Sequence, residues 1–300
     1  MSALTPRSAR TRKPPKTRML VVDDEPDNLD LLYRTFRRDF MVLRAESGQE
    51  ALNILSEQGE VAVIISDQRM PEMKGTEFLS KTVPEFPDTV RIILTGFTDV
   101  EDLVDAINAG QVYRYITKPW DPEALKQVVQ RAADTYEILK QRGDAIQQVQ
   151  TQQAIVLSLA DIAQKGEPQA ATLTATAEAL NEILNTGGCV VATVAEGQLG
   201  DGVGIGGKGE ATVLKENPLV ATAIAQHTPQ TLPDASTAEN ADAYQGAGIQ
   251  AHAVIPVLFR DEVVAIISCQ WPKTQVFSEA QLNLFTIAAR QVGLTLACCR

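Results

Sequence analysis

The segment Met19-Leu20-Val21-Val22-Asp23-Asp24 is an apolar run that ends in two carboxylates. Residues 61–65, 90–94 and 112–116 form three more apolar runs, and stretches with helical periodicity separate them. Continuous runs of this kind, rich in β-branched residues, are typical of buried parallel strands that alternate with helices. The segment and its repeats therefore predict an α/β fold built on a parallel sheet.

Polar residues follow these runs: Asp23 and Asp24 after the first, then Asp67, Thr95 and Lys118. Because the crevice of an open parallel sheet lies at the carboxyl ends of its strands, we expect all five to converge on one edge. Three carboxylates at one place repel each other and call for a cation, and oxygen ligands suit Mg2+. Lys118 and Thr95 add the charge and the donor that a phosphoryl group needs. The pattern predicts a site that holds a phosphoryl group beside Mg2+.

The motifs around these residues resemble the receiver domains of two-component response regulators over residues 18 to about 140. Their order, spacing and strand context all agree with that family. The resemblance implies a doubly wound, five-stranded parallel sheet and a receiver domain at 18–140. The matching motifs are Val21-Val22-Asp23-Asp24-Glu25-Pro26, Ser66-Asp67-Gln68-Arg69-Met70-Pro71 followed by Gly75, Leu94-Thr95-Gly96, and Thr117-Lys118-Pro119.

The resemblance implies that Asp67 is the phosphoacceptor, which attacks the phosphohistidine of a partner sensor histidine kinase and forms an aspartyl phosphate. It implies that Asp24, Asp67 and the backbone carbonyl of Arg69 ligate Mg2+ directly, whereas Asp23 acts through a metal-bound water. The chain would then be a phosphoacceptor signalling protein rather than an enzyme, with only self-phosphorylation from small donors and autodephosphorylation.

The same resemblance assigns the remaining positions of the site. Lys118 would pair with the phosphoryl oxygens, and Thr95 would move toward the phosphate once it forms. Tyr115, three residues before Lys118, would follow inward as the switch aromatic, while the small Gly96 would leave the phosphoryl group accessible. Each residue alone could be an ordinary polar group at a strand end, but that interpretation gives no reason for the shared spacing.

A length of 300 residues is enough for two domains, each with its own core. No run of about 18 apolar residues occurs and the N-terminus has no apolar signal core, so we expect a soluble, cytoplasmic protein that does not enter membranes. The four cysteines fit a reducing compartment. Cys189 stands in an apolar, strand-like run and is interpreted as a packed thiol rather than a chromophore attachment site.

Charge is unevenly distributed along the chain. The first 18 residues carry +6 with no acid, and the whole chain carries −11, so the other 282 residues carry −17. We expect residues 1–17 to be a disordered basic tail, which is either a solvated leader or a contact for nucleic acid or an acidic partner. The acidic body is a poor surface for DNA, so nucleic acid is not an expected partner.

A long helix is expected to follow the receiver over residues 121–165, overlapping the last receiver helix. Asp121 would cap it and Pro122 would occupy its first turn. Such a helix fits a signalling linker that pairs in a homodimer, whereas the alternative is an extended receiver helix followed by a flexible Gln-rich linker. The apolar stripe of this helix is interrupted by Thr135, Arg142 and Gln153, and Gly143 weakens the helix in its middle. The stripe comprises Leu125, Val128, Ala132, Leu139, Ile146, Val149 and Val156.

Residues 166–300 show an α+β order that ends in two paired strands, a tight Arg260-Asp261 turn between them, and an amphipathic helix capped by Ser278. This half resembles a GAF domain, chiefly over residues 250–300, and the resemblance implies an antiparallel sheet. The expected helices lie at 152–165, 168–185, 218–227 and from 278 onward, and the expected strands at 189–194, 251–259 and 262–270.

A glycine-rich segment, Gly202-Val203-Gly204-Ile205-Gly206-Gly207-Lys208-Gly209, satisfies G-x-G-x-x-G and the first part of the P-loop motif. The P-loop hypothesis fails at Gly209, where a Ser or Thr is required. Both phosphate-binding motifs also need a helix directly afterwards, whereas residues 210–214 resemble a strand. We therefore expect a flexible hairpin within the GAF-like sheet.

The C-terminal half has no output module recognisable by motif. No helix-turn-helix with a basic recognition helix is evident, and His227 and His252 are too few for a metal-dependent phosphodiesterase. The leading hypothesis is a response regulator whose receiver is joined by the helical linker to a GAF-like sensor or dimerisation module. Two alternatives stay open: a ligand-gated adaptor whose GAF-like half binds a small molecule such as a cyclic nucleotide or a tetrapyrrole, and a DNA-binding regulator with an unrecognised output.

Overall fold

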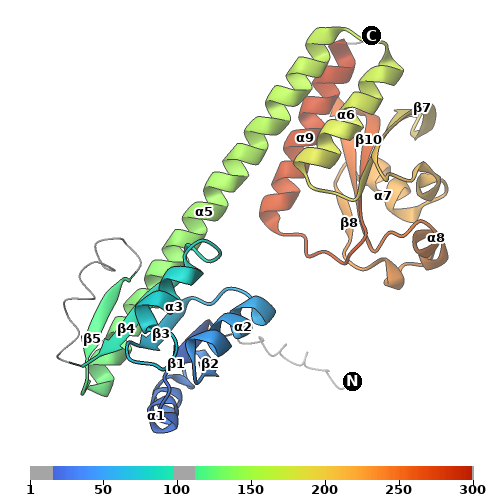
Figure 1. The fold of residues 1–300 in the computed structure, drawn as a ribbon. Coiled ribbons are helices and arrows are strands. Elements are labelled where there is room, and N and C mark those ends of the chain that lie inside the picture. The colour runs from blue at the N-terminus through green and yellow to red at the C-terminus, as the bar shows by residue number, and fades with distance from the viewer. Residues whose placement is uncertain (1–15, 97–111, 299–300) are drawn as a thin grey trace, which may run out of the picture. The chain divides into compact units, whose positions relative to one another are not determined.

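A computed structural model describes residues 16–96 and 112–298, so nearly all of the tail predicted at 1–17 lies outside the described residues. The chain divides into two units, Met1–Gly143 and Asp144–Arg300. Figure 1 colours the first unit from blue to green and the second from yellow-green to red.

The first unit contains a five-stranded sheet in the order β2-β1-β3-β4-β5, in which all neighbouring strands are parallel. This result confirms the predicted parallel sheet. Three strands end later than the apolar runs that predicted them, since β3 includes Asp67, β4 includes Thr95 and β5 includes Thr117. The strands are β1 (Arg18–Val22), β2 (Met41–Ala45), β3 (Val63–Asp67), β4 (Val90–Thr95) and β5 (Arg114–Thr117).

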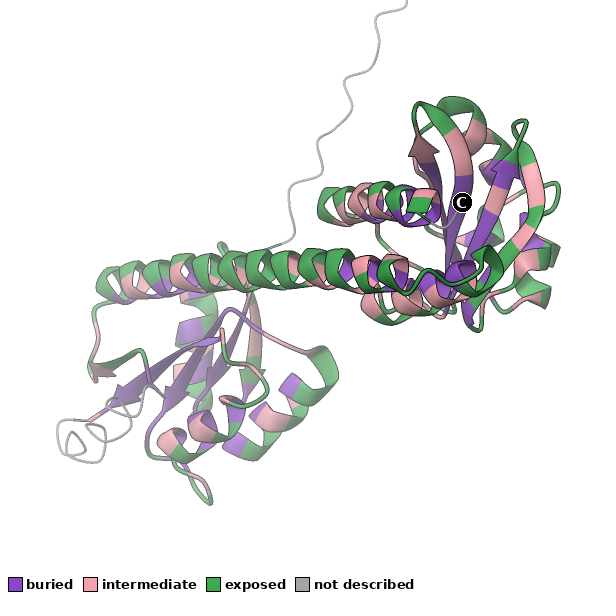
Figure 2. Cartoon of the chain, turned by 90° about the horizontal axis from the view of Figure 1, so that it is seen from above, coloured by how far each residue is buried: buried purple, intermediate pink, exposed green. Residues whose placement is uncertain are grey.

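Helices cover both faces of this sheet, so its three central strands, β1, β3 and β4, are buried on both sides (Figure 2). Leu29 of α1 and Leu125 at the start of α5 belong to one apolar cluster, and Leu55 of α2 and Phe78 of α3 belong to the other. Each fully buried side chain of this size contributes about 1.5–3 kcal/mol of transfer free energy to the stability of the unit. The first three helices are α1 (Pro26–Phe36), α2 (Gly48–Gln58) and α3 (Gly75–Thr82).

Helix α5 (Pro122–Lys165) is a single element of 44 residues. The Asp121 side chain caps it by accepting a hydrogen bond from the backbone N–H of Ala124 at 2.7 Å, as predicted. The helix expected at 152–165 is therefore the last part of α5 and not a separate element. The Gln-rich stretch is helical throughout, which disagrees with the alternative of a flexible linker.

The second unit contains a five-stranded antiparallel sheet in the order β7-β6-β10-β9-β8. Its longest hairpin turns at Arg260 and Asp261, whose φ angles of 53° and 65° suit the tight turn expected there. The strands are β6 (Gly188–Ala195), β7 (Gln198–Gly207), β8 (Gln230–Leu232), β9 (Ala251–Phe259) and β10 (Glu262–Trp271).

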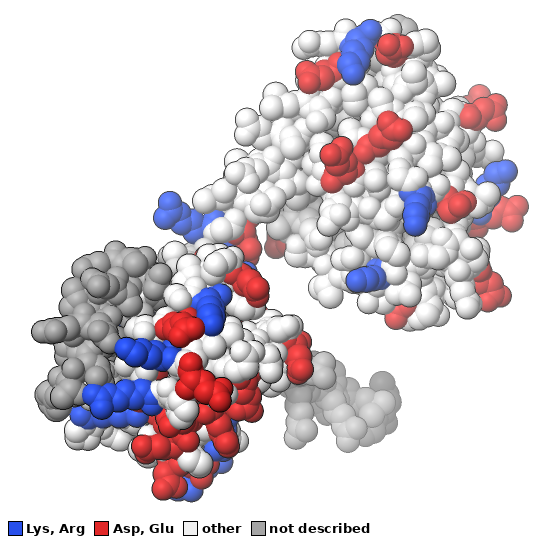
Figure 3. All heavy atoms as spheres, in the orientation of Figure 1, with Lys and Arg blue, Asp and Glu red and all other residues white. Residues whose placement is uncertain are grey.

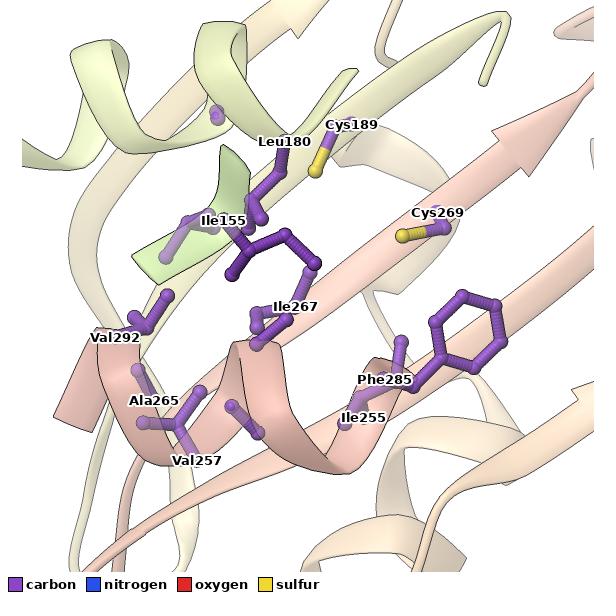
Figure 4. Packing of buried hydrophobic residues seen from close by; sticks show 14 of the residues in the cluster. Ile155, Leu180, Cys189, Ile255, Val257, Ala265, Ile267, Cys269, Phe285 and Val292 are labelled. Carbon is purple, nitrogen blue, oxygen red and sulfur yellow. The ribbon is translucent and has the colours of Figure 1, made fainter. Parts of the chain in front are cut away.

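Helices α6 (Gln169–Ile183) and α9 (Glu279–Cys298) and the last turns of α5 pack on one face of this sheet. Figure 4 shows Leu180, Ile155 and Phe285 converging there on the strands. The other face carries α7 (Pro218–Gln226) and a 3-10 helix, η1 (Ala211–Leu214), with η2 (Ala235–Thr237) and α8 (Ala241–Gly246) beyond them. The expectation of a strand at 210–214 is wrong, because Ala211–Leu214 form a 3-10 helix, in which Val213 and Leu214 are both buried.

Glycines along β7 allow α6 to pack directly on the strand backbone. A Cβ atom on Gly204 would lie 2.1 Å from the Leu173 carbonyl carbon, and one on Gly206 would lie 2.3 Å from the Ala177 carbonyl oxygen. The glycine-rich segment is therefore largely part of a paired strand and not the flexible hairpin that we expected. Glycine in a strand often marks a close backbone approach of this kind.

No helix within the described residues is both long enough and apolar enough to cross a membrane.

Candidate functional site

Four of the predicted site residues lie at the carboxyl ends of adjacent parallel strands. Asp67 ends β3 and Thr95 ends β4, while Asp23 directly follows β1 and Lys118 directly follows β5. These four strands are consecutive in the sheet order β1-β3-β4-β5. The parallel topology therefore brings the residues to one edge, as the sequence predicts.

Lys118 links two buried carboxylates at this edge. Its Nζ atom lies 3.1 Å from Asp23 Oδ2 and also forms an ion pair with Asp67 Oδ1. Asp23 and Asp67 are only 1% and 6% exposed, so water screens their charges little. The ammonium of Lys118 therefore offsets part of the repulsion between the two carboxylates.

Burial raises the pKa of Asp67, and the hydrogen bond and charge of Lys118, with the backbone N–H of Arg69, oppose that rise without cancelling it. Burial lowers the pKa of Lys118, but the hydrogen bond to Asp67 and the charges of Asp23 and Asp67 outweigh burial, so its pKa lies above the ordinary value. Lys118 therefore remains a cation, and Asp67 ionises more readily when a further cation approaches.

Backbone and amide donors fix the orientation of both carboxylates. The backbone N–H of Arg69 donates to Asp67 Oδ2 at 2.6 Å. Asp23 Oδ1 accepts hydrogen bonds from the backbone N–H of Glu25 and from Asn28 Nδ2, each at 3.0 Å. Asn28 was not predicted from the sequence, although its place one helical turn into α1 after the Asp pair is a signal that could have found it.

The turn after Asp67 is held by close backbone packing. A Cβ atom on Gly75 would lie 2.1 Å from the Asp67 carbonyl oxygen, so the turn accepts only glycine at that position without rearrangement. The side chain of Gln68 accepts a hydrogen bond from the backbone N–H of Thr76 at 3.1 Å and so satisfies a donor in the first turn of α3. These two contacts give a structural reason for the motif residues Gln68 and Gly75.

A cavity of about 250 Å³ opens beside Asp67. Asp24 lies exposed on its wall, and the buried Thr95 donates from Oγ1 to the backbone carbonyl of Gly96 at 3.1 Å. Among the described residues, no heavy atom lies within 4 Å of a Cβ position on Gly96, so these residues leave that side of the cavity open. The cavity is lined by Asp24, Glu25, Asp67, Gln68, Arg69, Thr95, Gly96 and Lys118.

Tyr115 lies apart from this cavity. Its side chain is 39% exposed and lines a separate hollow with Trp120 and the first turn of α5. The structure therefore brings Asp23, Asp67, Thr95 and Lys118 together but not Tyr115.

The donors around the cavity fit Mg2+. This ion takes oxygen ligands and commonly uses one or two carboxylates together with waters and a phosphate. Asp24, Asp67 and Arg69 line the same cavity, whereas Asp23 is held by Lys118 and Asn28. Within residues 16–96 and 112–298, no group of three or more His, Cys, Asp or Glu residues is placed to hold a metal ion. An open site completed by water fits this donor set better than a closed cage.

The second unit contains a buried polar network that was not predicted from the sequence. His252 Nδ1 lies 2.8 Å from the Tyr244 hydroxyl, and His252 Nε2 lies 2.7 Å from Ser268 Oγ. Asn217 Nδ2 donates to the Tyr244 oxygen and Gln270 Nε2 donates to Ser268 Oγ. A neutral imidazole carries one N–H, so one ring nitrogen of His252 donates to its hydroxyl partner and the other accepts from its own. Burial lowers the pKa of His252 to about 3.

An apolar cavity of about 870 Å³ lies between β7, η1 and α7 in the same unit. Leu199, Val203, Leu214 and Val220 supply much of its wall, and Lys215 is the only cation among the residues that line it. In Figure 3 the visible face of this unit carries scattered charges of both signs and no basic patch of the kind that nucleic acids bind.

Comparison with known proteins agrees with this geometry. Residues 19–130 match the family described as the response regulator receiver domain, and residues 169–296 match the GAF domain family. A chemotaxis protein CheY homologue from Campylobacter jejuni is 34% identical over 122 residues, which are 39% of this chain and 93% of that relative. The chain belongs to the response regulator receiver family. Its second unit is a GAF domain.

Other relatives are much longer than the part they share with this chain. The hydrogenase transcriptional regulatory protein HoxA of Cupriavidus necator is 43% identical over 116 residues, which are 39% of this chain and 24% of HoxA. The chain thus spans about a quarter of the length of the hydrogenase regulators that it matches. Among solved structures, a response regulator receiver domain protein from Clostridium thermocellum is 30% identical, with a TM-score of 0.39 over 41% of this chain and 98% of that one.

Proposed function

We propose that this chain is a two-component response regulator in which Asp67 accepts a phosphoryl group from a partner sensor histidine kinase. The observation that carries the proposal is the pairing of Lys118 with Asp67 and Asp23 beside an open cavity. A carboxylate nucleophile needs a cation for the transferred phosphoryl oxygens and a route for an incoming donor. The site offers both.

Each residue has a distinct role in the proposed transfer. One Asp67 oxygen attacks the phosphorus of the kinase's phosphohistidine, the P–N bond breaks, and the neutral imidazole leaves. The Arg69 backbone N–H meanwhile holds the other Asp67 oxygen in place. Lys118 stays charged and turns from Asp67 toward the phosphoryl oxygens as the aspartyl phosphate forms. Thr95 then exchanges its bond to the Gly96 carbonyl for a phosphoryl oxygen.

Asp24, Asp67 and the backbone carbonyl of Arg69 would hold Mg2+, with Asp23 acting through water. When bound, the ion neutralises charge on the carboxylates and on the phosphoryl group. Acetyl phosphate with Mg2+ should label the wild-type chain with one acid-labile phosphoryl group, and Asp67→Asn should remain unlabelled. Asp39→Asn, a change of the same kind at an exposed residue, should label normally. Equal labelling of the wild type and Asp67→Asn contradicts the assignment.

The signal would pass to the GAF domain along α5 in a homodimer. Four residues on this helix are between 37% and 62% exposed: Leu139, Ile146, Val149 and Val156. They are spaced seven, three and seven residues apart, which places them on one heptad stripe of the kind that pairs helices. Neither unit buries these side chains, so a second chain is their proposed partner. Phosphorylation should shift the monomer–dimer equilibrium by about five- to 150-fold, the range typical of coupled sites.

Replacing Leu139 and Ile146 with Asp should abolish this shift and leave Asp67 labelling intact. Sedimentation of the wild type with and without phosphorylation measures the effect. An unchanged mass and an unchanged scattering profile contradict signalling through the helix and favour partner recognition on the receiver surface.

A second candidate function is a ligand-gated adaptor, favoured by the 870 Å³ cavity in the GAF domain. Pockets of up to about 1,000 Å³ with mainly apolar walls are typical of small-molecule sites. The lining residues include one lysine and two acids, Asp201 and Glu216. The cavity therefore suits an uncharged apolar ligand better than a cyclic nucleotide or a tetrapyrrole, whose phosphate or propionate groups need more positive charge. Purified protein that is coloured, or that releases a small molecule on denaturation, supports this candidate.

A further inference from the structure

Two of the chain's four cysteines stand opposite each other in the GAF domain. Cys189 on β6 and Cys269 on β10 are direct partners in the antiparallel register, and both are 0% exposed. Figure 4 shows both sulfurs on the helix-covered face of the sheet, near Leu180 and Phe285. The function proposed above uses neither thiol.

The register places the two residues within the span of a disulfide bond. Directly opposed residues of an antiparallel pair have Cα atoms about 4.5–5.5 Å apart, and disulfides join Cα atoms about 4.4–6.8 Å apart. Their side chains project to the same face of the sheet. A bond between the sulfurs therefore requires side-chain rotation but no change in strand pairing.

The thiols already interact. The hydrogen bond to Cys269, and then burial, raise the pKa of Cys189 well above its ordinary value. Cys189 therefore keeps its proton while the strands are closed, so the first oxidation step falls to its partner Cys269.

We propose that Cys189 and Cys269 form a reversible disulfide when hydrogen peroxide enters the GAF domain. The Cys269 thiol loses its proton and attacks a peroxide oxygen as a thiolate. The O–O bond breaks, a sulfenic acid and hydroxide form, and the hydroxide takes up the released proton to give one water. The Cys189 sulfur then attacks the Cys269 sulfur, the S–O bond breaks, and a second water leaves. The thiols lose two electrons and two protons, and one peroxide becomes two waters. Peroxide is small and neutral, and it reaches the buried pair when the helices on this face open transiently.

The bond would tie β6 to β10 around the whole of β7, α7, α8 and β9. A crosslink that closes so long a loop restricts the unfolded and partly opened states most. Oxidation should therefore slow cleavage of the GAF domain by a nonspecific protease at least tenfold, an effect on the order expected for a native disulfide.

The test uses the full chain with Cys298→Ser and Cys299→Ser, which leaves only the pair. After peroxide treatment and removal of excess oxidant, the protein is denatured, alkylated with N-ethylmaleimide and weighed by mass spectrometry. The expected result is two alkylated thiols before oxidation, none afterwards, one peptide pair joined through Cys189 and Cys269, and two thiols again after dithiothreitol. Cys189→Ala and Cys269→Ala in the same background should yield no joined peptide within one chain.

Three results would overturn the proposal. In the first, both thiols remain alkylatable at a peroxide dose that oxidises the exposed Cys298 of the wild-type chain. In the second, sulfinic acid accumulates without a joined peptide. In the third, the disulfide joins two chains rather than two strands of one chain. Because the main readout uses native Cys189 and Cys269, a folding defect in either alanine variant leaves the test intact.

Discussion

The acid sensitivity of the GAF domain should depend on one buried imidazole. His252 is 0% exposed and its two ring nitrogens pair with Tyr244 and Ser268. Burial lowers the pKa of His252 from 6.5 to about 3. Between these two pH values the unfolded chain binds a proton at this residue and the folded chain does not, so the free energy of unfolding falls as the pH falls.

The size of the effect follows from the two pKa values. The contribution is fully present above pH 6.5 and is lost progressively as the pH falls toward 3. At 1.36 kcal/mol for each pH unit, the complete loss is on the order of 4–5 kcal/mol. Down to pH 4.5 the loss due to this residue is about 2.7 kcal/mol.

His252→Gln should remove this slope, because an amide supplies donor and acceptor groups but does not titrate in this range. The variant can be less stable at neutral pH, so the informative quantity is the slope and not the absolute stability. His227→Asn is the matched control. It removes the only other histidine, at a helix end with a φ of 57° that asparagine tolerates.

Urea unfolding followed by Trp271 fluorescence between pH 8 and 4.5 provides the measurement. Trp120→Phe in every variant leaves Trp271 as the only tryptophan, so the signal reports the second unit alone. The wild type and His227→Asn should lose about 2.7 kcal/mol over this range and His252→Gln much less. Equal losses in the wild type and His252→Gln would show that His252 is not the group responsible.

Three further predictions concern the metal, the nucleophile and the packing of β7. Asp24→Ala should weaken Mg2+ binding more than Asp23→Ala in a calorimetric titration, because Asp24 lines the cavity and Asp23 is held by Lys118. Equal weakening in the two variants would show that Asp24 does not ligate the ion directly. Labelling of Asp67 should slow as the pH falls through the raised pKa of its carboxyl group. Lys118→Met should move that decline to higher pH, because it removes the cation that lowers the pKa of Asp67 against the effect of burial. An unchanged pH profile in this variant contradicts the ion pair. Gly204→Ala should lower the free energy of unfolding by about 1–3 kcal/mol, because its Cβ would collide with the Leu173 backbone, whereas Gly246→Ala, which meets no atom within 4 Å, should change it little.

The edge that carries Asp23, Asp67, Thr95 and Lys118 could be predicted from the sequence because parallel topology alone decides it. Once the runs before Asp67, Thr95 and Lys118 are recognised as parallel strands, their ends must share an edge. The position of Tyr115 depends instead on its side-chain rotamer, which no spacing rule specifies, and its proposed switch role remains a prediction.

The GAF domain was harder to predict because its informative contacts join distant segments. The network around His252 joins Tyr244, Ser268 and Asn217. These side chains come into contact only when α8, β9, β10 and the residues before α7 pack together. No local sequence pattern predicts such contacts. The glycines of β7 did carry a signal. Gly202, Gly204 and Gly206 alternate, and a period of two points to one strand face that needs room for a neighbour's backbone.

Chemical mapping of the phosphorylated residue shows directly whether Asp67 is the acceptor. Borohydride reduces an aspartyl phosphate to homoserine, which mass spectrometry locates in the sequence. After treatment with acetyl phosphate and Mg2+, homoserine should appear at position 67 of the wild type and at no position of Asp67→Asn. Homoserine at another aspartate of the wild type, with position 67 unmodified, would rule out Asp67 as the phosphoacceptor.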